Sequence, residues 1–446
     1  MKRYFIEKLI EWSKKPTRKP LVLSGARQVG KTWILKEFAH QCFAKTAYVN
    51  FDRNEAMQNL FSGPFDFKRI LTGLQIETGV DITPGDTLII LDEIQLCGAA
   101  LTSLKYWQEN YPEYHVACAG SLIGLALQEG TGYPVGKTNS LTLYPMSFGE
   151  FLEAVDEAKL ADLVRHPDAM LLKTFSDKLK DLLRVYYFVG GMPAAIAAYC
   201  KTLSLAVARE VQEEILVEYA RDFAKHAPKR DVPRIRAIWS SLPVQLAKED
   251  KRFVASEVLN EKGGKSRSRD LKDPFEWLES AGLVYRVWNV SKPGVPLEGY
   301  KGSIFKLYGL DVGLLGAQSH LSPRAVIEGD RMFTEFKGAL TEQYVQQELR
   351  TTNGWPAYFW TKDNSRAEVD FVVEMDECVI PVEVKAEGNL RAKSLKSYRD
   401  IFSPELAVRA SMADMRFDEG LLNVPLYAIG WRWSRNNEMI GEYEQR

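Results

Sequence analysis

Eight residues near the N-terminus have the types and spacing of a phosphate-binding loop. Residues 25–32 read Gly-Ala-Arg-Gln-Val-Gly-Lys-Thr and fit the pattern G-x-x-x-x-G-K-[ST]. Glycines at both ends let the backbone bend toward an anion and direct its N–H groups inward. An apolar run at 21–23 and a helical pattern after residue 32 predict strand, loop and helix in that order. The predicted phosphate ligands are Gly25, Ala26, Arg27, Gln28, Val29, Gly30, Lys31 and Thr32.

A second strand supplies the carboxylates that hydrolysis of a triphosphate needs. Residues 87–91 are almost wholly apolar, as in a parallel strand buried on both faces, and Asp92 and Glu93 follow them. We predict that Lys31 reaches the β- and γ-phosphates and that Thr32 and Asp92 hold Mg²⁺. Glu93 is predicted to polarise the attacking water. The alternative is a core strand that ends in a solvated acidic turn.

A third strand, residues 114–119, leads to Gly120 and Ser121. In ATPases with an extra strand between the loop strand and the acidic strand, this position senses the γ-phosphate, so Ser121 is the candidate; an ordinary Gly-Ser turn is the alternative. Two more strands are expected at 46–52 and 140–145. Five strands alternating with helices predict a doubly wound α/β sheet with its ligand at the carboxyl ends of the strands.

Polar residues near the C-terminus could do metal-dependent chemistry. Asp370 lies in the first strand of an expected hairpin, and Glu383 and Lys385 share one face of the second. An Asp followed by Glu-x-Lys is the pattern of PD-(D/E)xK nucleases. We predict that Asp370 and Glu383 bind Mg²⁺, that Lys385 orients water and steadies the phosphate, and that Glu342 completes the site from a helix over 331–352. The alternatives are an edge hairpin with solvated charges and a nuclease fold that binds without cutting.

Composition bounds the class of protein. The chain has 446 residues, enough for about three domains, and is 46% hydrophobic. Its net charge of −1 means that nucleic-acid binding would need local basic patches. Five cysteines without a C-x-x-C pair argue against a disulfide framework or a zinc site and favour a reducing cytosol. No apolar run approaches the roughly 18 residues of a membrane span, so we predict a cytoplasmic protein without a membrane partner.

The pattern of elements suggests four segments: 1–150, a phosphate-binding core; 151–229, a helical lid; 230–325, a winged-helix-like domain; and 326–446, a nuclease-like domain. The lid is predicted from helical spacing at 152–164, 170–187 and 204–224, because such a helical group can close over a nucleotide. Helices at 232–246, 253–260 and 274–280, followed by a strand at 283–288, have the winged-helix order, which commonly binds DNA. Winged helices also contact proteins, so both kinds of partner stay open. The nearby basic residues that could contact phosphates are Lys225, Lys229, Arg230, Arg234, Arg236, Lys262, Lys265, Arg267, Arg269 and Lys272.

Several motifs together resemble a group of bacterial and archaeal AAA-type P-loop ATPases that carry a C-terminal domain of unknown function. The resemblance rests on residues 25–32, Leu-Asp-Glu-Ile-Gln at 91–95, Gly-Ser at 120–121, Tyr-Pro-Met-Ser-Phe-Gly-Glu-Phe-Leu at 144–152, Gly-Gly-Met-Pro at 190–193, Lys-Leu-Tyr-Gly-Leu-Asp-Val-Gly-Leu at 306–314, Gly-Ala-Leu-Thr-Glu-Gln-Tyr-Val at 338–345, Glu-Val-Asp-Phe-Val-Val at 368–373 and Val-Glu-Val-Lys at 382–385. It implies an ASCE/AAA-type doubly wound parallel sheet, a helical lid, a winged-helix-like domain and a restriction-endonuclease-like α/β domain. It also implies ATP binding at Gly30, Lys31, Thr32, Asp92 and Glu93.

One position departs from that group. Many relatives have Gly-Arg before the Pro-Leu-Ser-Phe-type strand, where this chain has Gly136 and Lys137. Lysine lacks the planar fork with which arginine holds a phosphate, so the arginine finger is left open, with Arg27 and Arg221 as candidates.

The leading hypothesis is a Mg²⁺-dependent ATPase whose nucleotide state controls a nucleic-acid-directed C-terminal module, with Mg²⁺-dependent phosphodiester cleavage as a second activity. The main alternative is an ATP-dependent switch or scaffold that holds a protein partner or forms a homo-oligomer and cuts nothing. A small-molecule kinase is a third option, but it leaves the C-terminal half without a role.

Overall fold

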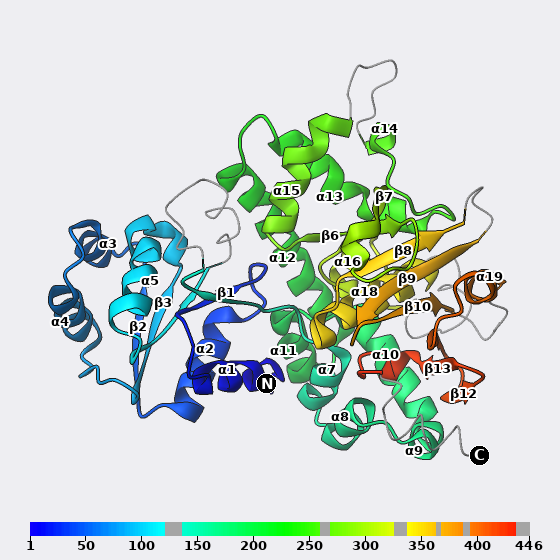
Figure 1. Cartoon of the computed structure of the whole chain (residues 1–446), viewed down its shortest axis with the longest axis horizontal. Coiled ribbons are helices and arrows are strands. Elements are labelled where there is room, and N and C mark those ends of the chain that lie inside the picture. Colours follow the sequence, from blue (N-terminus) through cyan, green and yellow to red (C-terminus); the bar gives the residue numbers. More distant parts are fainter. Residues whose placement is uncertain (121–135, 259–267, 325–336, 363–366, 387–392, 434–446) are drawn as a thin grey trace. The chain divides into compact units, whose positions relative to one another are not determined.

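The computed structural model describes residues 1–120, 136–258, 268–324, 337–362, 367–386 and 393–433. The chain divides into two compact units. The first comprises Lys2–Tyr144 and Trp277–Leu283, and the second comprises Pro145–Glu276 and Val284–Arg446 together with Met1. Most of the first unit is drawn in blue and cyan in Figure 1, and the second runs from green to red.

The first unit is a five-stranded parallel sheet covered by helices (Figure 1). Its strands are β1 (Leu21–Ser24), β2 (Lys45–Asn50), β3 (Thr87–Asp92), β4 (His115–Ala119) and β5 (Asn139–Thr142). Its helices are α1 (Phe5–Lys14), α2 (Lys31–Cys42), α3 (Glu55–Ser62), α4 (Phe67–Thr78) and α5 (Gly98–Asn110), with a short 3₁₀ turn η1 (Ile94–Leu96).

The strand order of this sheet is β2-β3-β4-β1-β5. Strand β4 therefore lies between β1, which precedes the loop, and β3, which ends in Asp92, and the prediction of an extra strand at this place is confirmed. Asp92 pairs with Asn50 of β2 and with Ala119 of β4, so these strands end at one edge. The parallel α/β fold thus delivers the loop and the acidic strand end to the same side of the sheet.

The second unit begins with helices α7 (Phe148–Ala154), α8 (Ala158–Arg165), α9 (Ala169–Thr174), α10 (Ser176–Val189), α11 (Pro193–Thr202) and α12 (Leu205–His226). It continues with α13 (Val232–Ala247), α14 (Ala255–Val258), η2 (Ser268–Leu271), α15 (Lys272–Ser280), which extends into the first unit, α16 (Val312–Gln318), α18 (Lys337–Asn353) and α19 (Lys393–Phe402).

Two helices predicted as continuous are each divided in two. Ser147 and Glu150 form a reciprocal capping box that starts α7 before the predicted residue 152, and Asp168 caps α9 through the Leu171 N–H. These caps satisfy N–H groups that a helix start leaves without partners. Apolar spacing alone did not separate α7 from α8 or α9 from α10, because the buried face continues across each break.

An eight-stranded mixed sheet forms the rest of the second unit. Its strands are β6 (Val284–Val290), β7 (Lys301–Gly309), β8 (Ala357–Thr361), β9 (Glu368–Met375), β10 (Cys378–Val384), β11 (Ala407–Ser411), β12 (Arg416–Asp418) and β13 (Leu421–Pro425), with short turns η3 (Leu297–Tyr300) and η4 (Leu426–Ala428). The order is β12-β13-β11-β10-β9-β8-β6-β7. Asp376 and Glu377 both have positive φ and close a two-residue hairpin between β9 and β10, as the sequence predicted.

The predicted boundary at residue 325 does not separate two sheets. Strands β6 and β7 form the expected antiparallel hairpin after α15, but β6 also pairs in parallel with β8, at Trp288 and Tyr358. The hairpin is therefore part of the eight-stranded sheet and not an independent wing (Figure 1). The sequence of β6 shows which residues are apolar. It does not show that β8, some seventy residues later in the chain, pairs with the other edge of β6.

The helices predicted as a lid lie within the second unit. Gln212 of α12 donates hydrogen bonds to the carbonyls of Phe188 and Val189 at 2.8 and 2.7 Å, at the end of α10. The Phe148 N–H at the start of α7 donates to Glu348 of α18 at 2.8 Å. Amphipathic spacing predicted that each helix has a buried face, and the structure shows that C-terminal elements cover part of it. A lid function for 151–229 stays a prediction.

A buried carboxylate ties two of the sequence motifs together. Asp311, 1% exposed, accepts hydrogen bonds from the backbone N–H groups of Gly191 and Leu314 at 2.5 and 3.0 Å and from the Gln347 amide at 3.2 Å. Gly191 is needed at its position, because a Cβ there would lie 2.2 Å from the Met146 carbonyl oxygen. The Gly-Gly-Met-Pro and Leu-Asp-Val-Gly segments are thus joined at one point in the core.

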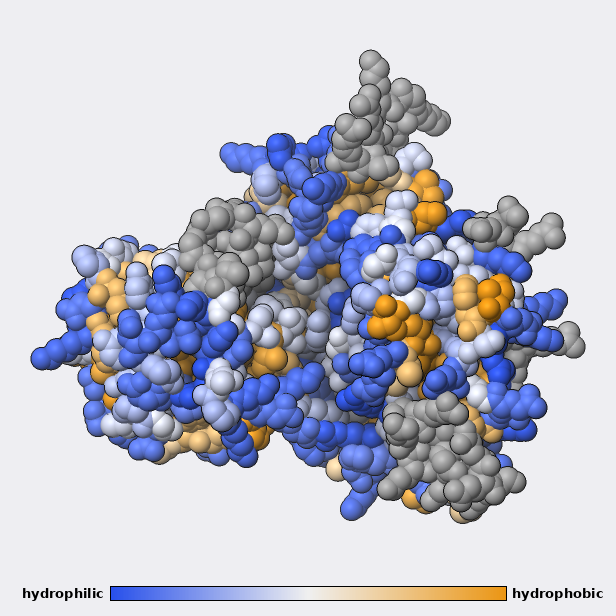
Figure 2. Space-filling model, in the orientation of Figure 1, coloured by the Kyte–Doolittle hydropathy of each residue, from blue (hydrophilic) through white to orange (hydrophobic). Residues whose placement is uncertain are grey.

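Figure 2 shows a face on which hydrophilic side chains dominate and apolar ones gather only in small separate patches. Among the described residues, no helix has both the length and the apolar character needed to cross a bilayer.

Replacing Asp311 with Ala should destabilise the second unit, because it leaves buried N–H donors without an acceptor. Each such donor costs about 1–3 kcal/mol, so we expect a loss of about 2 kcal/mol or more. Thermal unfolding followed by circular dichroism measures this as a lower Tm. The control is Asp177→Ala, because the Asp177 side chain is 97% exposed. An equal Tm for both variants would contradict a structural role for Asp311.

Candidate functional site

The loop after β1 has the backbone shape that the motif predicts. Gly25, Gln28 and Gly30 have φ values of 140°, 66° and 94°, and Gly30 caps the N-terminus of α2. A Cβ at Gly25 would lie 2.3 Å from the Leu143 carbonyl oxygen, so only glycine fits there. The first turn of α2 carries no acidic residue, so the positive end of the helix dipole faces the loop unopposed by its own side chains.

Lys31 lies inside the loop. Its ammonium group donates to the carbonyl oxygens of Gly25 and Ala26 at 3.0 and 2.8 Å, and the residue is 7% exposed. Burial lowers the pKa of Lys31 to about 8, although the charges of Glu93 and Asp92 act in the opposite direction. A lysine held this way has its charge poorly solvated, and an incoming anion would relieve that cost.

Thr32 and Asp92, the two residues that the sequence predicts to hold Mg²⁺, are in direct contact. The Thr32 hydroxyl donates to Asp92 Oδ2 at 2.8 Å, and the Tyr48 hydroxyl donates to the same oxygen at 2.9 Å. Asp92 Oδ1 accepts from the Glu93 N–H at 3.1 Å. Burial and the charge of Asp92 raise the pKa of Tyr48 to about 12, so Tyr48 stays a hydrogen-bond donor at neutral pH.

Glu93 lies at the end of β3 with a φ of 53°, in the left-handed region that few residues other than glycine adopt. Gln95 donates to Glu93 Oε2 at 2.5 Å and fixes the carboxylate. A strained backbone and a held side chain at the carboxyl edge of the sheet suit a residue whose position matters for chemistry.

The remaining predicted residues near the loop are placed as follows. Ser121 lies outside the described residues. Lys137 forms an ion pair with Glu109 at 2.8 Å, within the first unit. Arg27 is exposed on the loop itself, and Arg221 is exposed on α12 in the second unit. The identity of an arginine finger stays open.

Sequence reasoning missed three residues that hold this site. Arg3 donates to the Val29 carbonyl at 3.0 Å and to the Tyr144 carbonyl at 2.7 Å, and so fixes the loop from behind. Tyr48 and Gln95 hold Asp92 and Glu93. Gln95 stands in the quoted Leu-Asp-Glu-Ile-Gln motif and could have been found there, whereas nothing local in the sequence marks Arg3 or Tyr48.

The residues around the loop fit a magnesium ion. Thr32 offers a hydroxyl oxygen and Asp92 a carboxylate, the hard oxygen donors that Mg²⁺ prefers, and they already converge on one point. The loop itself offers backbone curvature and an ammonium group for phosphate.

The predicted C-terminal residues also converge. Asp370 accepts from the Val384 N–H at 2.8 Å, which joins β9 to β10 beside Glu383. Lys385 pairs with Glu383 Oε1 at 2.6 Å. Glu342 of α18 acts electrostatically on both Asp370 and Glu383, and burial and these like charges raise the pKa of each of the two. The structure therefore brings Glu342, Asp370, Glu383 and Lys385 into one cluster.

Two lysines that the sequence analysis did not single out for this cluster also enter it. Lys306 of β7 pairs with Glu368 at 2.5 Å, and Lys251 pairs with Glu342. The Tyr308 hydroxyl donates to the other oxygen of Glu342 at 3.1 Å. Lys306 and Glu368 both stand in motifs quoted above. The motifs alone do not show that they meet, because the β6–β7 hairpin brings Lys306 to the carboxylates.

These contacts do not fit the magnesium ion predicted for this cluster. Glu342, Glu368 and Glu383 each face an ammonium group. Among the residues that the structure describes, no three histidine, cysteine or acidic side chains are placed to hold a metal ion. Metal binding by Asp370 and Glu383 stays a sequence-based prediction.

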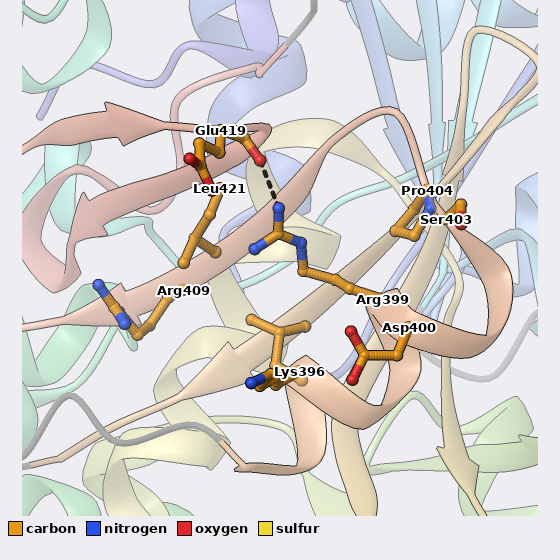
Figure 3. Close-up of a pocket in the computed structure, with 9 residues that line it drawn as sticks. Lys396, Arg399, Asp400, Ser403, Pro404, Arg409, Glu419 and Leu421 are labelled. Carbon is orange, nitrogen blue, oxygen red and sulfur yellow. Dashed lines mark hydrogen bonds between the residues drawn. The ribbon is translucent and has the colours of Figure 1, made fainter.

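A separate cavity of about 540 Å³ lies between α19 and the neighbouring strands β11 and β13. Its apolar lining comes from Leu395 and Leu421, and its basic lining from Lys396, Arg399 and Arg409. Figure 3 shows Arg399 directed to the backbone carbonyl of Glu419, to which it donates a hydrogen bond.

The basic groups of this cavity are held from the protein side. Arg409 donates to Asn423 at 3.1 Å, and Asn423 is 3% exposed and donates to the carbonyls of Ala413 and Asp414. The two acidic lining residues, Asp400 and Glu419, are exposed, whereas Arg399 and Arg409 are half-buried. Two fixed guanidinium groups in a mostly polar lining suit a ligand that carries phosphate.

Three family models match the chain. Residues 17–152 match a model described as an AAA domain, residues 180–325 match a domain of unknown function (DUF8612), and residues 337–429 match another domain of unknown function (DUF4143). The parallel α/β sheet, the loop and the AAA match together define the N-terminal segment as an AAA-type P-loop domain. The comparison with curated proteins found no match to this chain.

Three solved structures resemble this chain at low sequence identity. A Walker-type ATPase of Pyrococcus abyssi is 14% identical, with 71% of this chain and 95% of that chain covered and a TM-score of 0.45. The ORC2 protein of Aeropyrum pernix, in its ADP form, is 14% identical over 75% and 92% of the two chains, with a TM-score of 0.28. RuvB of Thermotoga maritima, a Holliday junction branch migration motor, is 13% identical over 64% and 90%, with a TM-score of 0.27. Likenesses this loose do not bear on function.

The lowered pKa of Lys31 predicts that ATP binding takes up a proton in mildly alkaline solution. The ligand-free folded protein loses this proton near pH 8, earlier than the unfolded chain does, so Lys31 costs stability below pH 8 and that cost disappears as the pH rises toward 10.5. Bound triphosphate favours the ammonium form. Affinity for ATP should therefore fall by up to about tenfold per pH unit above pH 8.

Isothermal titration calorimetry at pH 7.5, 8.5 and 9.5, in buffers of different ionisation enthalpy, measures both the affinity and the proton uptake. The matched control is Lys31→Arg, because its guanidinium stays charged and its profile should be flat. A wild-type affinity that does not change over this range would contradict the protonation of a buried Lys31.

Proposed function

We propose that this protein is a Mg²⁺-dependent ATPase that converts ATP and water to ADP and phosphate at the loop between β1 and α2. The observation that carries the proposal is the contact between Thr32 and Asp92 at 2.8 Å, beside a loop that encloses the Lys31 ammonium group. An ordinary glycine turn would not require Asp92, at the end of β3, to contact the hydroxyl of Thr32 in the first turn of α2.

Each residue has a role that follows from its position. Lys31 neutralises charge on the β- and γ-phosphates, and the N-terminus of α2 adds N–H donors. Thr32 and Asp92 would hold Mg²⁺, which when bound neutralises charge that develops on the phosphate oxygens. Glu93, fixed by Gln95, accepts a proton from the attacking water or orients it.

Two substitutions separate binding from hydrolysis. Lys31→Ala should abolish hydrolysis and weaken ATP binding, because it removes the charge inside the loop. Glu93→Gln should keep ATP binding but lower kcat by about 100-fold or more, because the amide cannot accept the proton. Phosphate release gives kcat, and equilibrium binding of a fluorescent ATP analogue gives affinity. Normal turnover by Glu93→Gln would show that another group acts on the water.

For the second unit we propose a binding module directed to phosphate-bearing polymers such as DNA, whose engagement depends on the nucleotide state of the AAA-type domain. The cavity lined by Lys396, Arg399 and Arg409 supports this proposal, because its fixed guanidinium groups suit phosphate. A protein partner or a second copy of the chain is the alternative occupant. We propose no cleavage by this unit, because ammonium groups face Glu342, Glu368 and Glu383 where a metal ion would bind.

Reversing one charge tests the basic cavity. Lys396→Glu should weaken the binding of a fluorescent single-stranded oligonucleotide and lower the slope of log affinity against log salt by about 1, since one phosphate contact is lost. The control is Lys159→Glu on α8, an equally exposed lysine away from the cavity. Fluorescence anisotropy with and without ATP measures both. Equal binding by the two variants would reject the cavity as the nucleic-acid site.

A further inference from the structure

The carboxylate cluster of the second unit contains its own cations. Glu342, Glu368, Asp370 and Glu383 come from α18, β9 and β10, and three lysines enter among them: Lys251, Lys306 and Lys385. In a metal-dependent phosphodiesterase the carboxylates would face a divalent ion. Here they face ammonium groups.

Lys306 is the most enclosed of the three. It is 1% exposed, its ammonium group pairs with Glu368 at 2.5 Å, and it lies over the Phe359 ring at 5.1 Å. The charges of Glu342 and Asp370 also act on it and raise its pKa, so it is a permanent cation. A buried ammonium group is tolerated only with such partners, because its desolvation is costly.

Both carboxylate oxygens of Glu342 already have a partner within the protein. Lys251 pairs with Oε1, and the Tyr308 hydroxyl donates to Oε2 at 3.1 Å. The side chains of Lys251 and Glu342 are 15% and 9% exposed, so water screens this pair weakly. Lys251 belongs to a segment that runs along β7, since Arg252 bridges to Lys306 and the Phe253 N–H donates to the Phe305 carbonyl.

Glu383 is the exception within the cluster. Lys385 takes its Oε1, and its buried Oε2 has no hydrogen-bond partner. Even with all four carboxylates ionised, the three ammonium groups leave only one negative charge in the cluster. Removal of one lysine would add a second unbalanced charge next to it.

We propose that the ammonium groups of Lys251 and Lys306 hold the place of the divalent ion in this nuclease-like cluster. The lysines therefore offset most of the charge of the cluster from within, so that the cluster binds no divalent cation in the native protein and fastens β7 and the segment before α14 to α18 and β9. The second unit then acts by binding and not by metal-dependent cleavage.

Metal titration tests this inference. The full-length Asp92→Asn variant serves as background, because it disables the predicted magnesium site of the loop. Electron paramagnetic resonance of free Mn²⁺ should show no tight binding to this background. Adding Lys306→Met should create one Mn²⁺ site per chain, and adding Asp370→Asn as well should remove it. Tight Mn²⁺ binding by the background that Asp370→Asn abolishes would overturn the inference, as would a Lys306→Met variant that binds no Mn²⁺.

Stability gives a second readout that needs no metal bound to the native protein. Lys306→Met should lower Tm by roughly 5 °C or more in EDTA, because it takes the buried cation away from Glu342, Asp370 and the half-buried Glu368. Mn²⁺ or the second substitution Glu368→Gln should restore part of the loss. The matched control is Lys301→Met on the same strand, whose lysine is exposed and pairs with Glu298. Equal Tm changes for the two lysines would overturn the inference.

Lys251→Met replaces Lys306→Met in both experiments if the latter does not fold, because Lys251 lies nearer the surface. Neither readout depends on ATP hydrolysis, so a failed ATPase proposal and a failed lysine proposal give separate results.

A plasmid assay tests cleavage directly. With Mg²⁺ or Mn²⁺, and with or without ATP, the wild-type protein should cleave plasmid no more than the Asp370→Ala variant does. Cleavage that does disappear in that variant would overturn the inference directly.

Discussion

The hydrogen bond between Thr32 and Asp92 is the interaction on which the proposed ATPase site of the first unit depends. It exists only because β1 and β3 run in parallel with β4 between them, so that a loop after one strand and a carboxylate after another reach the same edge. The close approach of Gly25 to the Leu143 carbonyl and the hold of Arg3 on Val29 keep the loop in place. The strand order, Gly25 and Arg3 therefore all help to hold the loop beside Asp92.

The second unit applies a different constraint, which is charge balance in a buried site. Its carboxylates are gathered as a nuclease-like pattern predicts, but lysines from β7 and from the segment before α14 neutralise them. Asp311 is also a buried carboxylate, but uncharged groups satisfy it: backbone N–H groups and an amide donate hydrogen bonds to it. Both arrangements fasten distant parts of the chain together through polar groups that would be costly to leave unpaired.

Local patterns in the sequence predicted local geometry well. The backbone of the loop at 25–32, the strand that ends in Asp92 and the two-residue turn at Asp376 and Glu377 are as expected, because each is encoded within a few neighbouring residues. Long-range partners were not predictable in this way. The pairing of β6 with β8, the entry of Lys306 among the carboxylates and the packing of α7–α12 within the second unit depend on how the chain returns in space. Arg3 and Tyr48 belong to the same class, since their partners lie dozens of residues away.

The parallel pairing of β6 with β8 has a consequence for dissecting this protein. Strand β6 acquires its second neighbour only when residues 357–361 are present, so a fragment that stops at residue 325 leaves the Trp288–Val290 edge bare. Bare strand edges recruit other chains and promote aggregation. Gene truncation between the two matched domains of unknown function would therefore yield aggregation-prone fragments. The second unit is best expressed whole.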